Sequence, residues 1–135
     1  MSDEQYQPDK TPGVFAWQEI VSNNKDGTVE FYSNLFGWTT EDMQMPNGDS
    51  YTMFMQGQRP IGGCISAPPE AENVPTMWLN YVNTDDLDAS VAKAKGLGAK
   101  ICKERVDLPM GSFAIAVDPQ GGTFAFWQPG EDCPE

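Results

Sequence analysis

Histidine is absent from this chain of 135 residues, and its 8 lysines and arginines face 20 aspartates and glutamates. The absence of histidine removes the most common protein ligand of zinc, nickel and iron. The net charge of −12 argues against binding to nucleic acid or to an anionic membrane surface, because both are polyanions. We therefore expect neither nucleic acid nor a membrane as a partner.

Cysteine and long apolar runs are also scarce. The three cysteines, Cys64, Cys102 and Cys133, are odd in number and lack a metal-type spacing such as C-x-x-C. No apolar run approaches the roughly 20 residues that span a bilayer. The start, Met-Ser-Asp-Glu-Gln, is polar and acidic, unlike a secretory signal. Together these features predict a cytoplasmic protein with free thiols.

The residues that are present predict a folded domain. Apolar residues make up 39% of the chain, with 7 Phe, 4 Trp and 4 Tyr, enough to bury one core but not two independent ones. We therefore expect a single domain over residues 1–135. The acidic residues are spread through predicted tails and loops, so we interpret their charge as serving solubility, although it would also attract a cationic ligand.

Apolar patterns and turn residues predict the order strand-helix-strand-strand-strand twice. The first module, 14–66, contains strands 14–21, 38–45, 50–56 and 59–66, with a helix from about Lys25 to Gly37. The second module, 77–128, contains strands 77–83, 99–108, 112–117 and 122–128, with a helix capped by Thr84 and closed by Gly96 and Gly98. The prolines of 67–76 indicate a linker, and 1–13 and 129–135 are predicted tails.

Each predicted helix has an apolar face. These faces consist of Val29, Phe31, Tyr32, Leu35 and Phe36 in the first helix, and of Leu87, Val91, Ala94 and Leu97 in the second. The modules align at a constant offset of 61, which places Trp17 on Trp78 and Gly37 on Gly98. Such a repeat indicates that each half buries its apolar face against the other.

This order, together with the segments Glu30–Trp38 (EFYSNLFGW) and Asp118–Phe124 (DPQGGTF), resembles the vicinal oxygen chelate superfamily of glyoxalases, bleomycin-resistance proteins and extradiol dioxygenases. The resemblance covers about residues 14–128. It implies an α+β fold in which two βαβββ modules form one eight-stranded cup, with helices outside and the ligand inside. It also implies a homodimer. The fold alone does not identify the reaction, because many chemistries share this scaffold.

Metal-dependent members of that superfamily use four inward positions, which fall here on Trp17, Cys64, Trp78 and Ala125. Trp and Ala offer no lone pair, and one Cys cannot hold an ion by itself. A shift of one residue would bring in Gln18, which is still a poor basis for a metal site. We therefore expect no metal and no other cofactor.

The predicted cup is instead aromatic, which is typical of a small-molecule site. Its expected ligand-binding residues are Trp17, Glu19, Cys64, Trp78, Asn80, Ala125 and Trp127. Indole rings can hold a flat or cationic organic molecule by stacking and cation–π attraction. The alternative is that these rings fill the cup as a closed core.

Two residues of the predicted cup have open roles. Glu19 could anchor a cation or act as a general base, or it could bond to backbone or to an arginine such as Arg59. For Cys64 an inert buried thiol is favoured over a nucleophile, because the chain has no histidine to activate it. Three hypotheses follow: a metal-free binder of a small aromatic or cationic molecule, an enzyme with an altered site using Glu19, or a non-catalytic interaction domain.

Overall fold

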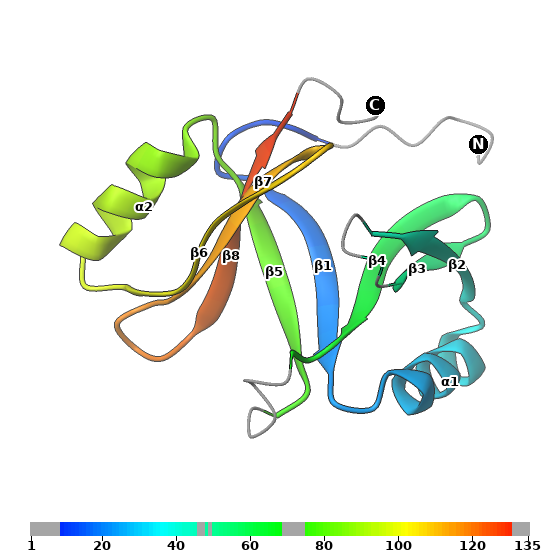
Figure 1. Cartoon of the computed structure of the whole chain (residues 1–135). Helices are drawn as coiled ribbons and strands as arrows, with labels where there is room; N and C mark the ends of the chain where they lie inside the picture. Colours follow the sequence, from blue (N-terminus) through cyan, green and yellow to red (C-terminus); the bar gives the residue numbers. More distant parts are fainter. Residues whose placement is uncertain (1–8, 46–47, 49, 69–74, 131–135) are drawn as a thin grey trace. The chain divides into compact units, whose positions relative to one another are not determined.

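The computed structural model describes residues 9–45, 48, 50–68 and 75–130 (Figure 1). Most of the predicted tails and linker, and most of the turn 46–49, lie outside the described residues. The elements follow the order βαβββ-βαβββ. They are β1 (Phe15–Ser22), α1 (Lys25–Phe36), β2 (Thr39–Gln44), β3 (Ser50–Gln56), β4 (Arg59–Ser66), β5 (Met77–Asn83), α2 (Leu87–Gly96), β6 (Lys100–Leu108), β7 (Gly111–Val117) and β8 (Thr123–Pro129). The predicted α+β class and duplicated order are confirmed.

Helix α1 begins and ends at the residues that its caps require. The side chain of Asn24 accepts a hydrogen bond from the N–H of Gly27 at 3.0 Å, which satisfies one of the unpaired donors of the first turn. At the other end Gly37 has φ = 75°, a left-handed conformation that glycine adopts without steric cost, and its N–H bonds to the carbonyl of Ser33.

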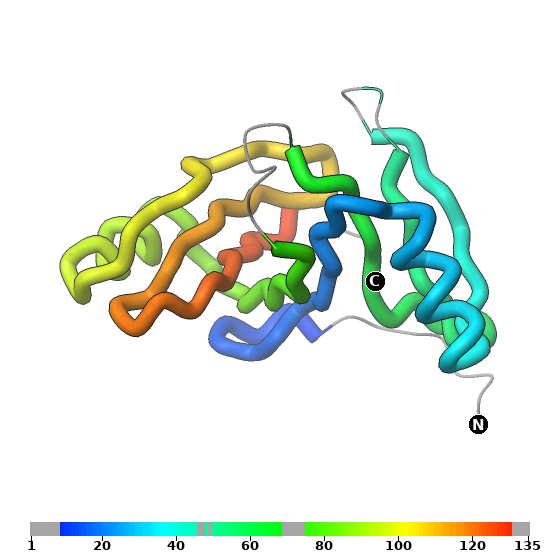
Figure 2. The backbone as a smooth tube through the Cα atoms, turned by 90° about the horizontal axis from the view of Figure 1, so that it is seen from below, coloured from blue at the N-terminus to red at the C-terminus, as the bar shows by residue number. Residues whose placement is uncertain are grey.

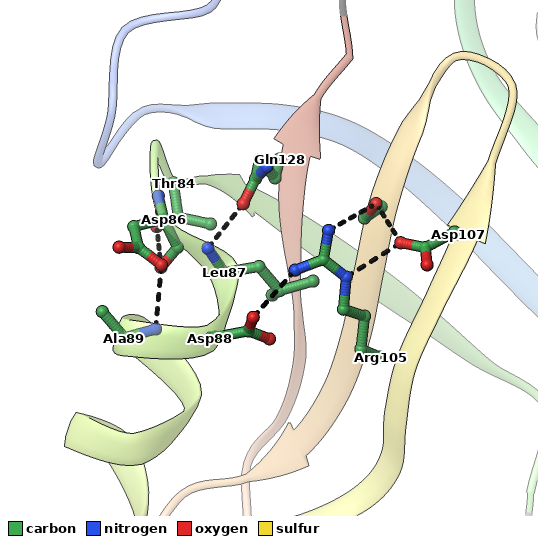
Figure 3. A network of polar contacts seen from close by, with 9 residues as sticks. Thr84, Asp86, Leu87, Asp88, Ala89, Arg105, Asp107 and Gln128 are labelled. Carbon is green, nitrogen blue, oxygen red and sulfur yellow. Dashed lines mark hydrogen bonds and ion pairs between the residues drawn. The ribbon is translucent and has the colours of Figure 1, made fainter.

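The start of α2 differs from the prediction, in which Thr84 caps the helix. The cap is Asp86, whose carboxylate accepts a hydrogen bond from the N–H of Ala89 at 3.1 Å (Figure 3). Thr84 is still part of the strand pairing, because its N–H bonds to the carbonyl of Trp127 on β8. The helix therefore starts later, at Leu87.

The chain divides into two compact units, of which the first holds Gln18–Leu79 and the second holds 80–130 together with 9–17. In the first unit the strands follow the order β2-β3-β4-β1, and in the second the order β5-β8-β7-β6. In each repeat the first and last strands run parallel, which can be followed in Figures 1 and 2. The neighbouring hairpins are antiparallel.

One helix packs against one face of the strands in each unit. Beneath α1, the buried Ile20, Phe54 and Cys64 meet Val29 and Tyr32 of the helix. Beneath α2, the buried Ala114, Ala116 and Phe126 of the strands meet Leu87, Val91 and Ala94 of the helix. The predicted apolar faces are therefore correct only in part, since Phe31, Leu35 and Phe36 of α1 are more than half exposed and Leu97 is 70% exposed.

The repeats correspond at an offset of 62 rather than the predicted 61. The antiparallel partners Thr52 and Cys64 of the first unit correspond to Ala114 and Phe126 of the second, each 62 residues later. The helix caps agree, because Asn24 corresponds to Asp86. An offset of 61 holds only locally, at Gly37 and Gly98, which both have positive φ after their helices. A slip of one residue moves a strand side chain to the opposite face, so this correction changes the expected site.

Candidate functional site

Glu19 is the one charged side chain that is buried in the described part of the chain, with 5% of its surface exposed. Its neighbour Ile20 packs beneath α1. Because side chains alternate between the faces of a strand, Glu19 points to the face away from α1. A register row runs across this face from Glu19 on β1 to Gly63 on β4, Met53 on β3 and Glu41 on β2. We call it the helix-free face of the first unit.

The ring of Tyr51 lies across Gly63 on this face. A Cβ atom at Gly63 would lie 2.8 Å from Cε2 of Tyr51 and would overlap Cζ and the hydroxyl. The absence of a side chain at Gly63 therefore gives the phenol its place. Gly63 on β4 pairs with Glu19 on β1 across the parallel ladder. The hydroxyl end of Tyr51 therefore lies over β4, the strand next to the one that carries the buried carboxylate. The helix-free face thus combines a buried acid and a phenol.

Cys64 lies on the opposite side, in the core beneath α1, where none of its surface is exposed. Burial raises the pKa of its thiol to about 11; the charge of Lys25 lowers this pKa and the charge of Glu19 raises it. The thiol is therefore protonated at neutral pH. A protonated buried thiol is neither an effective nucleophile nor a metal ligand.

The corresponding face of the second unit is aromatic. At the offset of 62, Glu19 and Gly63 correspond to Tyr81 and Ala125, which are likewise partners across parallel strands. The ring of Tyr81 meets Phe113 at a centroid distance of 6.1 Å and Trp127 at 6.4 Å, both edge to face. These residues point away from α2, because their neighbour Phe126 packs beneath that helix.

The predicted site residues are divided between the two units. Glu19, Cys64 and Trp78 belong to the first unit, and Trp17, Asn80, Ala125 and Trp127 belong to the second. Within the first unit the structure does not bring the three together. Glu19 points away from α1 and Cys64 lies beneath it, while the indole N–H of Trp78 donates to the hydroxyl of Tyr32 of α1 at 3.2 Å. Trp78 is 38% exposed, and its ring meets that of Tyr32 at 5.4 Å.

The residues of the second unit also differ in their surroundings. Ala125 is fully buried, Trp127 is half-buried and Asn80 is exposed. Cys64 corresponds to Phe126 rather than to Ala125, so the predicted equivalence of Cys64 and Ala125 is wrong. The sequence prediction missed Tyr51, Gly63 and Tyr81 as members of the helix-free faces. An alignment of the two repeats at an offset of 62 residues would have identified them.

These residues do not fit a divalent metal ion. The repeat-related positions on the helix-free faces are Glu19, Gly63, Tyr81 and Ala125, which provide one carboxylate and one phenol. Among the residues that the structure describes, no group of three His, Cys, Asp or Glu side chains could hold an ion. A zinc site normally has at least three protein donors, and these positions supply two.

A second polar cluster lies at the start of α2, and it has a structural role. The guanidinium of Arg105 donates to Asp88 on α2 at 3.1 Å and to Asp107 on β6 at 2.8 Å (Figure 3). The hydroxyl of Ser112 donates to Asp107 at 2.6 Å, and this bond together with Arg105 lowers the pKa of Asp107. The cluster ties helix to strands, as does Gln128, which accepts from the N–H of Leu87.

Comparison with known proteins gives a consistent result. A family model described as the Glyoxalase/Bleomycin resistance protein/Dioxygenase superfamily matches residues 15–126. A relative named "Putative glyoxylase CFP32" from Mycobacterium tuberculosis is 34% identical over 118 residues, 87% of this chain and 44% of that protein. The "Anthracycline biosynthesis protein DnrV" of Streptomyces peucetius is 29% identical over 132 residues, 88% of this chain and 48% of that protein. The chain thus spans about half the length of these relatives.

Solved structures agree on the fold. A hypothetical protein, BH1468, from Bacillus halodurans has a TM-score of 0.66 at 12% identity, covering 93% of this chain and all of the other. Methylmalonyl-CoA epimerase from Mycobacterium tuberculosis has a TM-score of 0.60 at 12% identity, covering 96% of each chain. In the described ranges, neither helix has the length and apolar character needed to cross a membrane.

Proposed function

We propose that this chain, which belongs to the glyoxalase/bleomycin resistance protein/dioxygenase superfamily, binds a small organic cation that carries an aromatic ring. The observation that carries the proposal is the burial of Glu19 on the helix-free face of the first unit. The proposed ligand-binding residues are Glu19 and Tyr51 of this unit.

A buried carboxylate favours a cation for energetic reasons. The negative charge of a carboxylate attracts a cation more strongly in surroundings of low dielectric constant than in water. An organic cation can respond to this charge and, unlike a zinc ion, does not need three protein donors. The net charge of −12 adds a long-range field that attracts cations to the protein.

The helix-free face of the second unit offers a separate surface of aromatic rings. Tyr81, Phe113 and Trp127 present rings on the face away from α2, and an aromatic ring or a cation can interact with them. Each such contact contributes about 0.5–2 kcal/mol. In the first unit the ring of Tyr51 can make such a contact, which favours a ligand that is aromatic as well as charged.

Calorimetric titration with benzyltrimethylammonium, and with benzyl alcohol as a neutral comparison, tests the proposal. We expect the cation to bind and the alcohol to bind much more weakly. Glu19→Gln keeps the shape of the side chain but removes its charge, and should weaken binding of the cation about ten- to hundredfold. Glu41→Gln is the matched control, since Glu41 ends the same register row but is exposed, and its affinity should be unchanged.

The results that would contradict the proposal are specific. Equal affinity of wild-type protein and Glu19→Gln would remove the role of the buried carboxylate. Equal affinity for the cation and the alcohol would remove the preference for charge. Tyr51→Leu tests the aromatic contact separately and should weaken binding about two- to thirtyfold, the range that one ring contact accounts for.

A catalytic role for Glu19 is the second candidate function, and it rests on the name of the glyoxylase relative and on the chemistry of a buried acid beside a phenol. A carboxylate held in an apolar sheet can act as a general base. Isomerisation of the hemithioacetal of methylglyoxal and glutathione, followed by absorbance, tests it. Turnover that is lost in Glu19→Gln and kept in Glu41→Gln would support catalysis, and no turnover would exclude this reaction.

A further inference from the structure

Two carboxylates stand at opposite ends of one register row in the first unit. The row runs through the observed partners Glu19, Gly63, Met53 and Glu41, with one residue from each of the strands β1, β4, β3 and β2. Neighbouring strands lie about 4.8 Å apart, so three strand spacings separate the Cα atoms of the two glutamates by about 14 Å. A single small cation therefore reaches only one of the two carboxylates.

The next residue of β2 shows which face Glu41 occupies. Asp42 accepts a hydrogen bond from the hydroxyl of Thr52 at 2.7 Å, and Thr52 pairs with Cys64, which lies beneath α1. Because side chains alternate along a strand, Glu41 lies on the helix-free face together with Glu19. Glu41 is exposed, and within the part of the chain that the structure describes it has no hydrogen bond or ion pair. Its carboxylate is therefore available to a ligand.

The surface between the two carboxylates carries no charge. The phenol of Tyr51 occupies the space over Gly63, and Met53 is the next residue of the row. An alkyl or aromatic segment can lie against a phenol ring and a thioether, because both are apolar and polarisable. The row thus presents a negative charge, an apolar surface and a second negative charge, in this order.

The second repeat shows that the fold does not require these two charges. At the offset of 62 the same row consists of the observed partners Tyr81, Ala125, Ile115 and Lys103. A phenol thus stands in place of Glu19, and a cation stands in place of Glu41. Because the same register forms there without any carboxylate, the two acids are a property of the first unit and not of the βαβββ module.

We propose that the ligand of the first unit carries a second positive charge, which lies beside Glu41 while the first lies beside Glu19. This inference rests on the proposed function, because it extends the same ligand along the row. The ligand class is a linear organic dication whose two ammonium groups are about as far apart as the two carboxylates. An apolar segment joins them and crosses Tyr51 and Met53. A divalent metal ion does not meet this description, because both of its charges lie at one point.

Calorimetric titration of the whole chain with two ligands of equal length tests the inference. Both have a benzyldimethylammonium head and a chain of about ten methylene groups, long enough to span three strand spacings. One chain ends in a trimethylammonium group and the other in a hydroxyl group. We expect the dication to bind about two- to fivefold more tightly than the hydroxyl compound, which is the range of one exposed ion pair. The difference should shrink as salt is added, because salt screens an exposed charge.

Three variants locate the second charge. Glu41→Gln should bring the affinity for the dication down to that for the hydroxyl compound. Asp42→Asn is the matched control, because it removes the same charge one residue away on the opposite face of β2, and it should keep the advantage of the dication. Glu19→Gln should weaken both compounds about ten- to hundredfold. Benzyltrimethylammonium is too short to reach Glu41, so Glu41→Gln remains a control for that ligand.

The outcomes separate this inference from the proposed function. Equal affinities of the two compounds for the wild type would overturn the inference. So would an advantage of the dication that survives Glu41→Gln, or one that Asp42→Asn removes to the same extent. In each of these cases, weaker binding of the hydroxyl compound to Glu19→Gln would still support the proposed function. If Glu19→Gln binds the hydroxyl compound as tightly as the wild type does, the proposed function fails and the inference fails with it.

Discussion

Replacing Gly63 with alanine tests the arrangement around Glu19 most sharply. The new Cβ atom would lie 2.8 Å from Cε2 of Tyr51 and would overlap the end of that ring, so the phenol must turn away. Overpacking of this kind costs about 1–3 kcal/mol. Alanine is also preferred over glycine within a strand, by roughly 0.5–1 kcal/mol, because glycine loses more conformational freedom on folding. The net effect should be a destabilisation of about 1 kcal/mol.

The background without Tyr51 changes the sign of this effect. In a Tyr51→Ala protein the clash is absent, and only the strand preference remains. Gly63→Ala should then stabilise the chain by about 0.5–1 kcal/mol. Urea denaturation of the wild type, both single variants and the double variant measures the coupling, which we expect to be about 1–3 kcal/mol.

The repeat provides a control for the same experiment. Ala125 corresponds to Gly63 in the second unit and already carries a Cβ atom, while Phe113, the counterpart of Tyr51, meets Tyr81 instead. Ala125→Gly should therefore destabilise the chain by roughly 0.5–1 kcal/mol whether position 113 is phenylalanine or alanine. A Gly63→Ala variant that is destabilised equally with and without Tyr51 would refute the reasoning.

Three further predictions concern stability. Since burial raises the pKa of Cys64 to about 11 from 9.0, the unfolded chain loses this proton first, and the free energy of unfolding should fall by about 1.4 kcal/mol per pH unit between pH 9 and 11. Cys64→Ala should lack this part of the slope in urea titrations, and identical slopes would contradict the shift. Phe54→Ala removes a fully buried ring and should cost about 3–5 kcal/mol by the same assay. Asp86→Ala should lower stability by about 1 kcal/mol and Asp85→Ala by much less, because only Asp86 caps α2; equal losses would contradict this assignment.

The elements were predictable wherever local chemistry determines their ends. The bounds of β3, β4 and β5 agree with the prediction, because the turn at Gly57 and the proline-rich segment after β4 interrupt apolar runs of strand length. Helix α1 was predictable for the same reason, since Asn24 and Gly37 supply its caps within a few residues of its apolar pattern. These signals act over one turn or less.

The exposure of side chains was less predictable, because it depends on contacts distant in sequence. The pattern of α1 marks Phe31, Leu35 and Phe36 as apolar, but it does not reveal that the strands cover only Val29 and Tyr32. In the same way, the hydroxyl of Thr84 matches a helix cap by type, while its backbone remains paired with β8. The strand pairing, and not the residue type, decides where α2 begins.

The faces of the candidate site depend on an offset that the parallel ladders alone do not reveal. Glu19 pairs with Gly63, Ile20 pairs with Cys64, and Tyr81 pairs with Ala125. An offset of 62 maps the pair Glu19–Gly63 onto Tyr81–Ala125, and an offset of 61 maps Ile20–Cys64 onto the same pair. Both offsets fit because every pair in a parallel ladder has the same separation in sequence. An identical residue such as Trp17 and Trp78 then favours 61.

The antiparallel hairpins resolve this ambiguity, since a slip of one residue on both strands changes the register by two. Only the offset of 62 carries Met53 and Gly63 onto the observed partners Ile115 and Ala125. At that offset Glu19 corresponds to Tyr81, and Cys64 corresponds to Phe126. Like Phe126 beneath α2, Cys64 lies in the core beneath its helix, α1. The candidate acid and its aromatic counterparts therefore follow from the register of two hairpins, which no single-strand pattern encodes.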